Sequence, residues 1–329
     1  MLKYKTYVKR LMLILLLLFG GSFLYVYHYA KSYPIPLFHR ISLDAKMKFI
    51  RDMERREAID TIIVGSSIGL NNLQGLELER SAKTIHHLLN FSALGLQAPQ
   101  IEQLSKLFSL FPNLKRVIYS AQYEDWSGAN TFESSEIDAA RTYLLLGREK
   151  IDLHYTIYTY KHLLEFAKNH WQWEKKYRPN TTNHGLSFDA SGSVPLEMYG
   201  DKINHKMYAT PPLDTLLFQE DYQALQRVAK ALHKQGIAFY FIAEPYRAYM
   251  LKHYKEIAQA RRSFIQETQR IVTDAGGVFL DLHPQLHLGD AYFADREHLN
   301  SKGSLMTAKA VATLIDRTES KIIQKENDE

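Results

Sequence analysis

Three residues in two short blocks could together carry out nucleophilic catalysis. Asp295 and His298 lie three residues apart, so one turn can bring the carboxylate to the imidazole and leave the other ring nitrogen free to accept a proton. Far upstream, Ser67 closes a Gly-Ser-Ser turn directly after the apolar run 61–64. A serine just past a strand is exposed at the carboxyl edge of a sheet, where α/β proteins bind ligands. We therefore expect a serine nucleophile, a histidine base and an orienting carboxylate.

The two blocks together resemble the SGNH (GDSL-like) hydrolase superfamily. In that superfamily a serine in an early Gly-Asp-Ser-like turn works with a late Asp-x-x-His. Ser66 stands where the pattern usually has Asp, so Ser67 matches the nucleophile. The Gly-Ser-Ser form with a later His-Leu-Asn is more similar to the membrane-anchored envelope branch, which includes proteins of teichoic-acid D-alanylation and alginate acetylation. The resemblance spans residues 57–315 and implies a flavodoxin-like sheet and acyl transfer.

Acyl transfer also needs hydrogen-bond donors where negative charge develops. The Ser67 backbone N–H is one natural donor, and the resemblance implies the N–H of Gly95 as a second. The superfamily usually carries Gly-x-Asn-Asp after its third strand, whereas residues 120–125 read Ser-Ala-Gln-Tyr-Glu-Asp, so Gln122 is the candidate substitute. Three further residues end the fourth predicted strand at the same edge and are substrate-binding candidates, with a solvated loop as the alternative. They are Glu244, Tyr246 and Arg247.

The amino end predicts a membrane anchor. Four basic residues up to Arg10 precede the uncharged run 11–27, which approaches the ~17–25 residues of a bilayer span. The basic flank is expected to stay cytoplasmic, which makes this a single-pass protein of the cell membrane with an extracytoplasmic catalytic domain. A cleaved signal peptide is the alternative, but no convincing small-x-small site follows the run. We expect residues 1–32 to be the anchor and residues 33–329 to be the catalytic domain.

Composition limits the chemistry further. The chain has no cysteine, which excludes disulfides, thiolate catalysis and cysteine metal sites. Its net charge of +5 suits anionic envelope polymers or headgroups, and the absence of an arginine-rich stripe argues against nucleic acid. No phosphate-binding loop is present, since Gly65-Ser66-Ser67-Ile68-Gly69 lacks the following Gly-Lys-Ser/Thr. We expect no cofactor and no metal; the histidines of region 135–173 favour helix packing.

Alternating strand and helix patterns predict an α/β fold with a flavodoxin-like parallel sheet and helices on both faces. The expected strands are residues 60–64, 84–90, 115–121, 237–243 and 278–281. The expected helices are residues 43–56, 99–111, 222–235, 257–275 and 304–315. Between the third and fourth strands lies an insertion at 126–217, with a helical part and a polar part, which we expect to cap the site.

These observations predict a membrane-anchored extracytoplasmic serine acyltransferase or esterase that acts on a cell-envelope polysaccharide or teichoic-acid-like polymer. The sequence does not separate transfer from hydrolysis, because both use the same triad and differ in which acceptor reaches the acyl-enzyme. The resemblance also implies a membrane-bound O-acyltransferase as partner. The alternative from another class is a non-catalytic anchored scaffold of an envelope assembly complex, which the departure at residues 120–125 favours.

Overall fold

The computed structural model describes residues 2–54, 56–128, 131–146, 153–176, 186–203, 205–209 and 218–328. The chain forms two compact units. Unit 1 comprises Met1–Met53 and Asp138–Lys175, and unit 2 comprises Glu54–Ile137 and Lys176–Glu329. The predicted division at residue 32 stays a prediction.

Unit 2 is built on a five-stranded sheet in the order β2-β1-β3-β4-β5, with every neighbouring pair parallel. The strands are β1 Thr61–Val64, β2 Leu88–Asn90, β3 Arg116–Ala121, β4 Ala238–Ala243 and β5 Val278–Asp281. This is the flavodoxin-like order, so the predicted fold class is confirmed. Strands β1, β2 and β3 are buried along their whole length, which explains why they read as continuous apolar runs rather than alternating ones.

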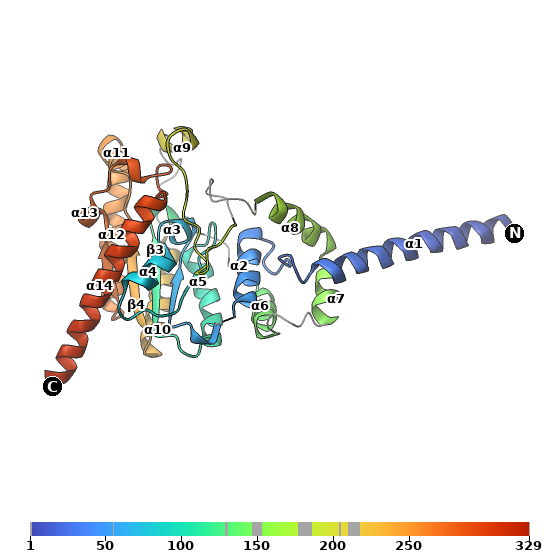
Figure 1. Cartoon of the computed structure of the whole chain (residues 1–329), viewed down its shortest axis with the longest axis horizontal. Helices are drawn as coiled ribbons and strands as arrows, with labels where there is room; N and C mark the ends of the chain where they lie inside the picture. Colours follow the sequence, from blue (N-terminus) through green and yellow to red (C-terminus); the bar gives the residue numbers. More distant parts are fainter. Residues whose placement is uncertain are drawn as a thin grey trace. The chain divides into compact units, whose positions relative to one another are not determined.

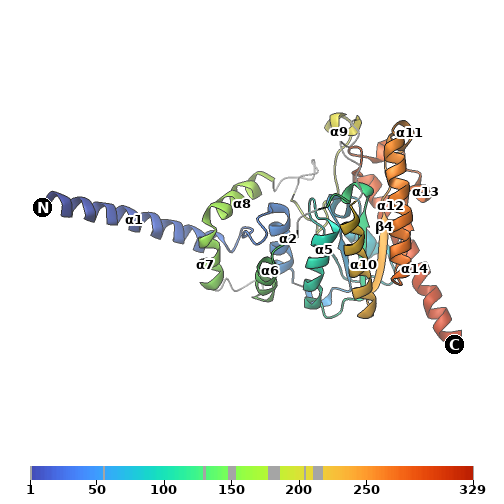
Figure 2. The ribbon, with the colours of Figure 1, turned by 180° about the vertical axis from the view of Figure 1, so that it is seen from behind.

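Helices cover both faces of the sheet. Figure 1 shows α4 (Gly75–Ser81) and α14 (Ser301–Asp328) in front of the strands, and Figure 2 shows α5 (Ala98–Ser105), α10 (Gln219–Lys234) and α12 (Lys255–Asp274) on the opposite face. Short elements complete the unit at the strand ends. They are η1 Arg56–Ala58, α3 Ser67–Asn71, η2 Lys106–Leu110, η3 Tyr123–Asp125, η4 Gly200–Lys202, α9 His205–Ala209, α11 Ala248–His253, α13 His283–Leu286 and η5 Asp290–Tyr292.

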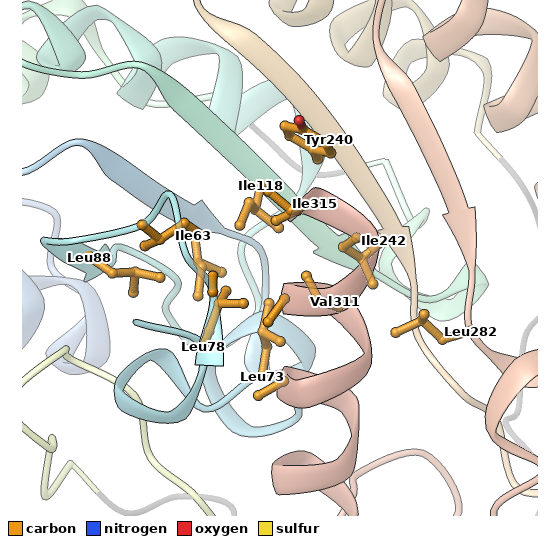
Figure 3. Close-up of a cluster of buried hydrophobic side chains, with 14 residues drawn as sticks. Ile63, Leu73, Leu78, Leu88, Ile118, Tyr240, Ile242, Leu282, Val311 and Ile315 are labelled. Carbon is orange, nitrogen blue, oxygen red and sulfur yellow. The ribbon is translucent and has the colours of Figure 1, made fainter. Parts of the chain in front are cut away.

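The core on the α4 and α14 side joins the carboxyl-terminal helix to the strands. Val311 and Ile315 of α14 pack beside Ile118 and Ile242 from the two central strands (Figure 3), and all four side chains are fully buried. Burial of such side chains contributes about 1.5–3 kcal/mol each. This packing fixes α14, and therefore the loop directly before it, against the carboxyl edge of the sheet.

Unit 1 contains a long amino-terminal helix and helices from the insertion. Its helices are α1 Leu2–Tyr29, α2 Ile41–Asp52, α7 Leu153–Lys161 and α8 Leu163–Lys176. Helix α6, Ser134–Leu146, crosses the boundary between the two units. Within α1, the segment Tyr4–Tyr29 is long and apolar enough to cross a membrane.

The structure describes the predicted insertion only in part. Within 135–173, residues 147–152 lie outside the described residues, and the described residues are largely helical as expected, in α6, α7 and α8. Of the polar stretch, the structure describes residues 186–203 and 205–209, while 177–185, 204 and 210–217 lie outside the described residues. Residues 186–203 belong to unit 2, where Val194 donates its backbone N–H to Leu70 of α3 over 2.9 Å.

Candidate active site

The turn after β1 is shaped by two glycines. A Cβ added to Gly65 would lie 2.3 Å from the Ser120 carbonyl oxygen, and one added to Gly69 would lie 2.6 Å from Ser92 Oγ. Only glycine therefore allows β1 to turn into α3 this close to the end of β3. Ser66 is buried and caps α3 by accepting the Ile68 N–H over 3.0 Å. The next residue is the first of the helix.

Ser67 begins α3 at the carboxyl edge of the sheet and is partly exposed. Its Oγ lies 2.9 Å from His298 Nε2. On the other side of the ring, His298 Nδ1 lies 2.9 Å from Asp295 Oδ2 and 3.1 Å from Oδ1. A carboxylate at Nδ1 accepts the Nδ1–H, which leaves the Nε2 lone pair facing the serine hydroxyl. The structure thus brings the three residues together in the order that deprotonation of a serine needs.

The loop that carries Asp295 and His298 is held closed by its own backbone. The Ala294 N–H donates to the His298 carbonyl over 2.8 Å, and the His298 N–H donates to Asp295 Oδ1 over 2.7 Å. The Glu297 N–H donates to the same carboxylate oxygen over 3.0 Å. Asp295 thus bonds both the imidazole and the peptide groups of its own turn. The short spacing read from the sequence reflects this compact loop.

The pKa shifts of Asp295 and His298 favour a negative carboxylate next to a positively charged imidazole. Burial opposes ionisation of Asp295, but the imidazole and the N–H donors outweigh it and hold the pKa of the carboxyl below its usual value. Burial also acts to lower the pKa of His298, yet the charge and hydrogen bond of Asp295 raise it overall. A base with a raised pKa holds a proton firmly once it has taken it from the nucleophile.

Asn72 and Gln122 clamp the histidine loop to the rest of the site. Asn72 accepts the Leu299 N–H over 2.9 Å and donates to the Glu297 carbonyl over 3.2 Å. Gln122, at the end of β3, donates to the same Glu297 carbonyl over 3.0 Å and to the Pro245 carbonyl over 2.8 Å. Asn72 was not identified from the sequence. Its only signal in the sequence is the polar pair Asn71-Asn72, which follows the nucleophile turn.

The role of Gln122 as an oxyanion donor stays a prediction, and its amide has other partners in this structure. Both hydrogens of its side-chain amide are used by backbone carbonyls, and the side chain is buried. In this structure the amide of Gln122 contacts the histidine loop through the Glu297 carbonyl.

Gly95 lies in the turn after β2, next to the nucleophile turn. It is exposed and has a φ of 67°, a left-handed conformation that favours glycine. Two residues earlier, Ala93 donates its N–H to the Gly65 carbonyl over 3.3 Å. The two turns are thus joined, and the role of Gly95 as a second oxyanion donor stays a prediction. Ser67 is the first residue of α3, and the first N–H groups of a helix have no acceptor within the helix. The Ser67 N–H is therefore available for a developing oxyanion.

The three residues at the end of β4 are engaged with neighbouring elements. Glu244, Tyr246 and Arg247 are all buried. Ser120 donates its hydroxyl to Glu244 over 2.7 Å, and Tyr246 donates its hydroxyl to Glu124. The alternative of a solvated loop is wrong, because these side chains are buried against neighbouring elements, whereas substrate contact stays a prediction.

Arg247 is a structural clamp at the same edge. Its Nε and Nη2 reach the two carboxylate oxygens of Asp290 over 2.9 and 2.7 Å, and its Nη1 donates to the Tyr208 carbonyl over 2.6 Å. The guanidinium also lies over the Tyr208 ring, 3.5 Å from its centroid. It therefore ties α9 to η5, and all three of its nitrogens are engaged within the protein.

Acidic side chains surround the histidine. Arg296 binds Glu124 over 2.9 Å, and Glu124 is also hydrogen-bonded to the carboxyl of Glu297. Burial first, and then the charge of Glu124, raise the pKa of Glu297 well above its usual value, which favours a protonated carboxyl hydrogen-bonded to Glu124. Burial likewise raises the pKa of Asp125 to about 7, against hydrogen bonds from Ser66 and the Gln122 N–H.

Two groups of described residues could hold a metal ion by spacing alone. One is Asp295, Glu297 and His298, whose ligand atoms are already engaged in the hydrogen bonds given above. The other is His39, His162 and Glu165 in unit 1, with ligand atoms within 4.8 Å of one another. The first group therefore fits proton transfer better than metal binding.

A hollow of about 360 Å³ in unit 2 is lined by Leu76, Glu79, Arg80, Ala82, Ile85 and His86. Ile85 and His86 precede β2, so this hollow lies toward the amino edge of the sheet, whereas Ser67 follows β1 at the carboxyl edge. It is not part of the Ser67 site.

No protein-family model matches the chain, and no curated protein matches its sequence. Fold and site together therefore define its class from the structure alone. The chain is an α/β protein with a serine, a histidine and an aspartate in hydrogen-bonded series at the carboxyl edge of a parallel sheet.

Proposed function

We propose that the chain is a membrane-anchored serine acyltransferase or esterase of the SGNH type. The observation that carries the proposal is the hydrogen-bonded series from Ser67 through His298 to Asp295, set where the flavodoxin-like sheet presents its carboxyl edge. Asn300, directly after the histidine block, closes the loop by donating to the Ala291 carbonyl over 2.7 Å.

In the proposed reaction Ser67 Oγ attacks the carbonyl carbon of an acyl ester while His298 Nε2 takes the hydroxyl proton. The tetrahedral oxyanion forms beside the Ser67 N–H. His298 returns the proton to the leaving alkoxide, which departs as an alcohol and leaves an ester on Ser67. An acceptor hydroxyl, or water, then attacks that ester with His298 again acting as base, and Ser67 is regenerated.

The compartment and the acceptor follow from the amino-terminal helix and from the resemblance. The apolar helix Tyr4–Tyr29 with its basic flank supports a domain held at the outer face of the cell membrane. An envelope polysaccharide or teichoic-acid-like polymer is the acceptor that this location and the resemblance favour. A membrane-bound O-acyltransferase is the partner that would supply the acyl group.

The decisive experiment is labelling of the full-length chain in detergent by a fluorophosphonate, which forms a covalent bond only with an activated serine. We expect labelling of the native chain and of Ser66→Ala, and none of Ser67→Ala. If the native chain folds correctly but does not label, the anchored scaffold becomes the better hypothesis. Labelling that persists in Ser67→Ala would place the nucleophile elsewhere.

A further inference from the structure

Two helices of unit 1 pack directly onto the end of the apolar helix α1. The Ser22 hydroxyl donates to Tyr160 of α7 over 3.3 Å, and the Tyr25 hydroxyl lies 2.7 Å from His170 Nδ1 of α8. Phe166, fully buried in α8, lies against the Tyr25 ring with centroids 5.8 Å apart. In both views of the chain, α7 lies across the end of α1 (Figures 1 and 2).

This packing fixes the depth of α7 and α8 relative to a membrane. The uncharged run 11–27 has 17 residues, which at 1.5 Å per residue spans roughly 25 Å, less than the ~30 Å hydrocarbon core. The apolar helix continues to Tyr29, so the outer end of the run lies close to the outer edge of the hydrocarbon core. Ser22 and Tyr25, near this outer end, are residues that α7 and α8 contact. The two helices therefore lie at the level where hydrocarbon meets headgroups.

The outward side chains of these helices suit that level. Leu153 and Ile157 on α7 are 62% and 43% exposed. Leu164 and Trp171 on α8 are 82% and 62% exposed. Several exposed apolar side chains on neighbouring helices indicate an interaction surface where a single one would not, and tryptophan is enriched where membrane and water meet.

Lysines share the exposed face of α8. Residues 164, 168, 171 and 175 recur at spacings of four and three, so they line one side of the helix. Lys168 and Lys175 alternate there with Leu164 and Trp171, and Lys175 Nζ lies 4.9 Å from the Trp171 ring centroid. Apolar side chains mixed with lysine are typical of helices that bind the surface of anionic membranes.

We propose that α7 and α8 form a membrane-surface collar around the anchor, with Leu164 and Trp171 in the headgroup layer and Lys168 and Lys175 bound to anionic headgroups. The lipid surface is the occupant because these two helices pack on the outer end of the apolar helix that is proposed to cross the bilayer. The collar holds whether or not Ser67 is a nucleophile. It would fix the orientation of unit 1 on the membrane instead of leaving it tethered by a single helix.

The proposal can be tested by attaching a spin label to one introduced cysteine. Because the chain has no cysteine of its own, each single-cysteine variant carries one label at a known position. The full-length chain, reconstituted in vesicles containing phosphatidylglycerol, is spin-labelled at Leu164→Cys or Trp171→Cys. Collision with oxygen, which concentrates in lipid, is compared with collision with a water-soluble nickel chelate. Leu15→Cys in the anchor is the lipid reference. Leu76→Cys, at an exposed leucine of unit 2, is the water reference.

We expect the labels at 164 and 171 to be severalfold more accessible to oxygen than to the chelate, as at 15 and unlike at 76. Labels at 164 and 171 that behave like the one at 76 would overturn the collar. Labels shielded from both quenchers would also overturn it, because another protein would then cover this face.

The charge contribution is tested by a matched pair of variants. Lys168→Gln/Lys175→Gln should lower the oxygen preference at position 171 severalfold in anionic vesicles and leave it unchanged in phosphatidylcholine vesicles. The control is Lys230→Gln/Lys234→Gln, two exposed lysines of α10 in unit 2, which should change nothing. An equal effect of both pairs would contradict headgroup recognition by α8.

Discussion

Ser66 and Ser67 are neighbours in the turn after β1, but their different environments suit them to different roles. Ser66 is 3% exposed and its Oγ bonds the Ile68 N–H, whereas Ser67 is partly exposed and faces the imidazole. A buried capping hydroxyl cannot reach an acyl carbon. The nucleophile is therefore assigned by contacts, and the assignment is testable by substitution.

We expect Ser67→Ala and His298→Ala to lower kcat for a p-nitrophenyl ester by roughly 10⁵-fold or more, because either change removes the covalent route. Asp295→Asn should cost roughly ten- to a hundredfold less, since both reacting groups remain. Ser66→Ala is the matched control and should keep most of the activity. The assignment fails if Ser66→Ala abolishes turnover while a folded Ser67→Ala retains it.

The acidic surroundings of His298 predict a characteristic pH profile. The imidazole must be neutral to accept the serine proton, and its pKa is raised, so the rate should rise with pH to a plateau above that pKa. Asp125, with a pKa of about 7, becomes negative over the same range and helps to hold the proton on His298. We expect Asp125→Asn to shift the midpoint of kcat/KM to lower pH.

The comparison for that measurement is Asp201→Asn, at an exposed position of unit 2, which should leave the midpoint unchanged. A midpoint that moves to higher pH in Asp125→Asn would mean that this carboxyl does not act on the imidazole through its charge.

How far single residues can be predicted from sequence depends on the range of their contacts. Ser67, Asp295 and His298 could be predicted because each sits in a local motif whose place at a sheet edge follows from the fold. Gln122 could not, since its partners lie 123 and 175 residues further along the chain. The sequence around residue 122 therefore gives no signal that its amide binds two backbone carbonyls.

At the scale of elements, the β1–α3 turn depends on space that only glycine leaves. Gly65→Ala places a Cβ 2.3 Å from the Ser120 carbonyl oxygen, so either the turn or the end of β3 must shift. We expect a loss of about 1–3 kcal/mol in the free energy of unfolding, together with reduced activity. Gly289→Ala, with no atom within 4 Å, is the control and should change stability by less than ~0.5 kcal/mol. Equal stability of the two variants would contradict this account of the turn.

A buried acid joins the ends of β3 and β4. Burial raises the pKa of Glu244 from 4.5 to about 8, against the lowering effect of the Ser120 hydrogen bond. The neutral carboxyl therefore contributes stability that is complete below pH 4.5 and is lost as the pH rises toward 8. A tenfold change in an acid dissociation constant corresponds to about 1.4 kcal/mol, so the effect is large enough to measure.

We expect the free energy of unfolding of the native chain to fall between pH 5 and pH 8 more steeply than that of Glu244→Gln. The amide keeps the shape and hydrogen bond of the neutral acid but does not ionise. Denaturant unfolding of the detergent-solubilised chain at several pH values measures the difference. Parallel curves would show that Glu244 is already ionised in the folded state.

All five strands could be predicted from their apolar runs, and the structure confirms them, but several boundaries differ. β2 begins at Leu88 instead of residue 84, because the preceding residues form no strand pairs. α14 continues to Asp328 instead of ending near residue 315. One of its later residues, Glu319, pairs with Arg116 through contacts of 2.5 and 2.7 Å. An ion pair across 203 residues leaves no periodic signal in the helix itself.

At the scale of the whole molecule, the basic flank and apolar helix predict that unit 2 lies outside the cytoplasm. In intact cells that express Leu76→Cys, a membrane-impermeant maleimide should label the chain without permeabilisation. A cysteine in the basic flank, Lys5→Cys, lies on the other side of the proposed span and should label only after permeabilisation. The reverse pattern would invert the topology.

The grouping of residues 138–175 with the amino end could not be predicted from sequence. The insertion looked like a single cap because its helices follow one another along the chain. Its contacts with the anchor, such as Tyr25 with His170 across 145 residues, depend on single aromatic and polar pairs instead of a motif. Part of the insertion thus belongs to unit 1, while residues 186–203 remain with the triad loop of unit 2.

The 231 residues that separate Ser67 from His298 have a consequence for synthesis. The ribosome completes the nucleophile turn long before it reaches the base, so a nascent chain carries an inert serine until all five strands have been made. In the proposed topology most of the chain would by then have left the cytoplasm. Chains truncated before Asp295 should therefore resist fluorophosphonate even though Ser67 is present. The order of the motifs would thus prevent Ser67 from reacting with acyl thioesters while the chain is still in the cytoplasm.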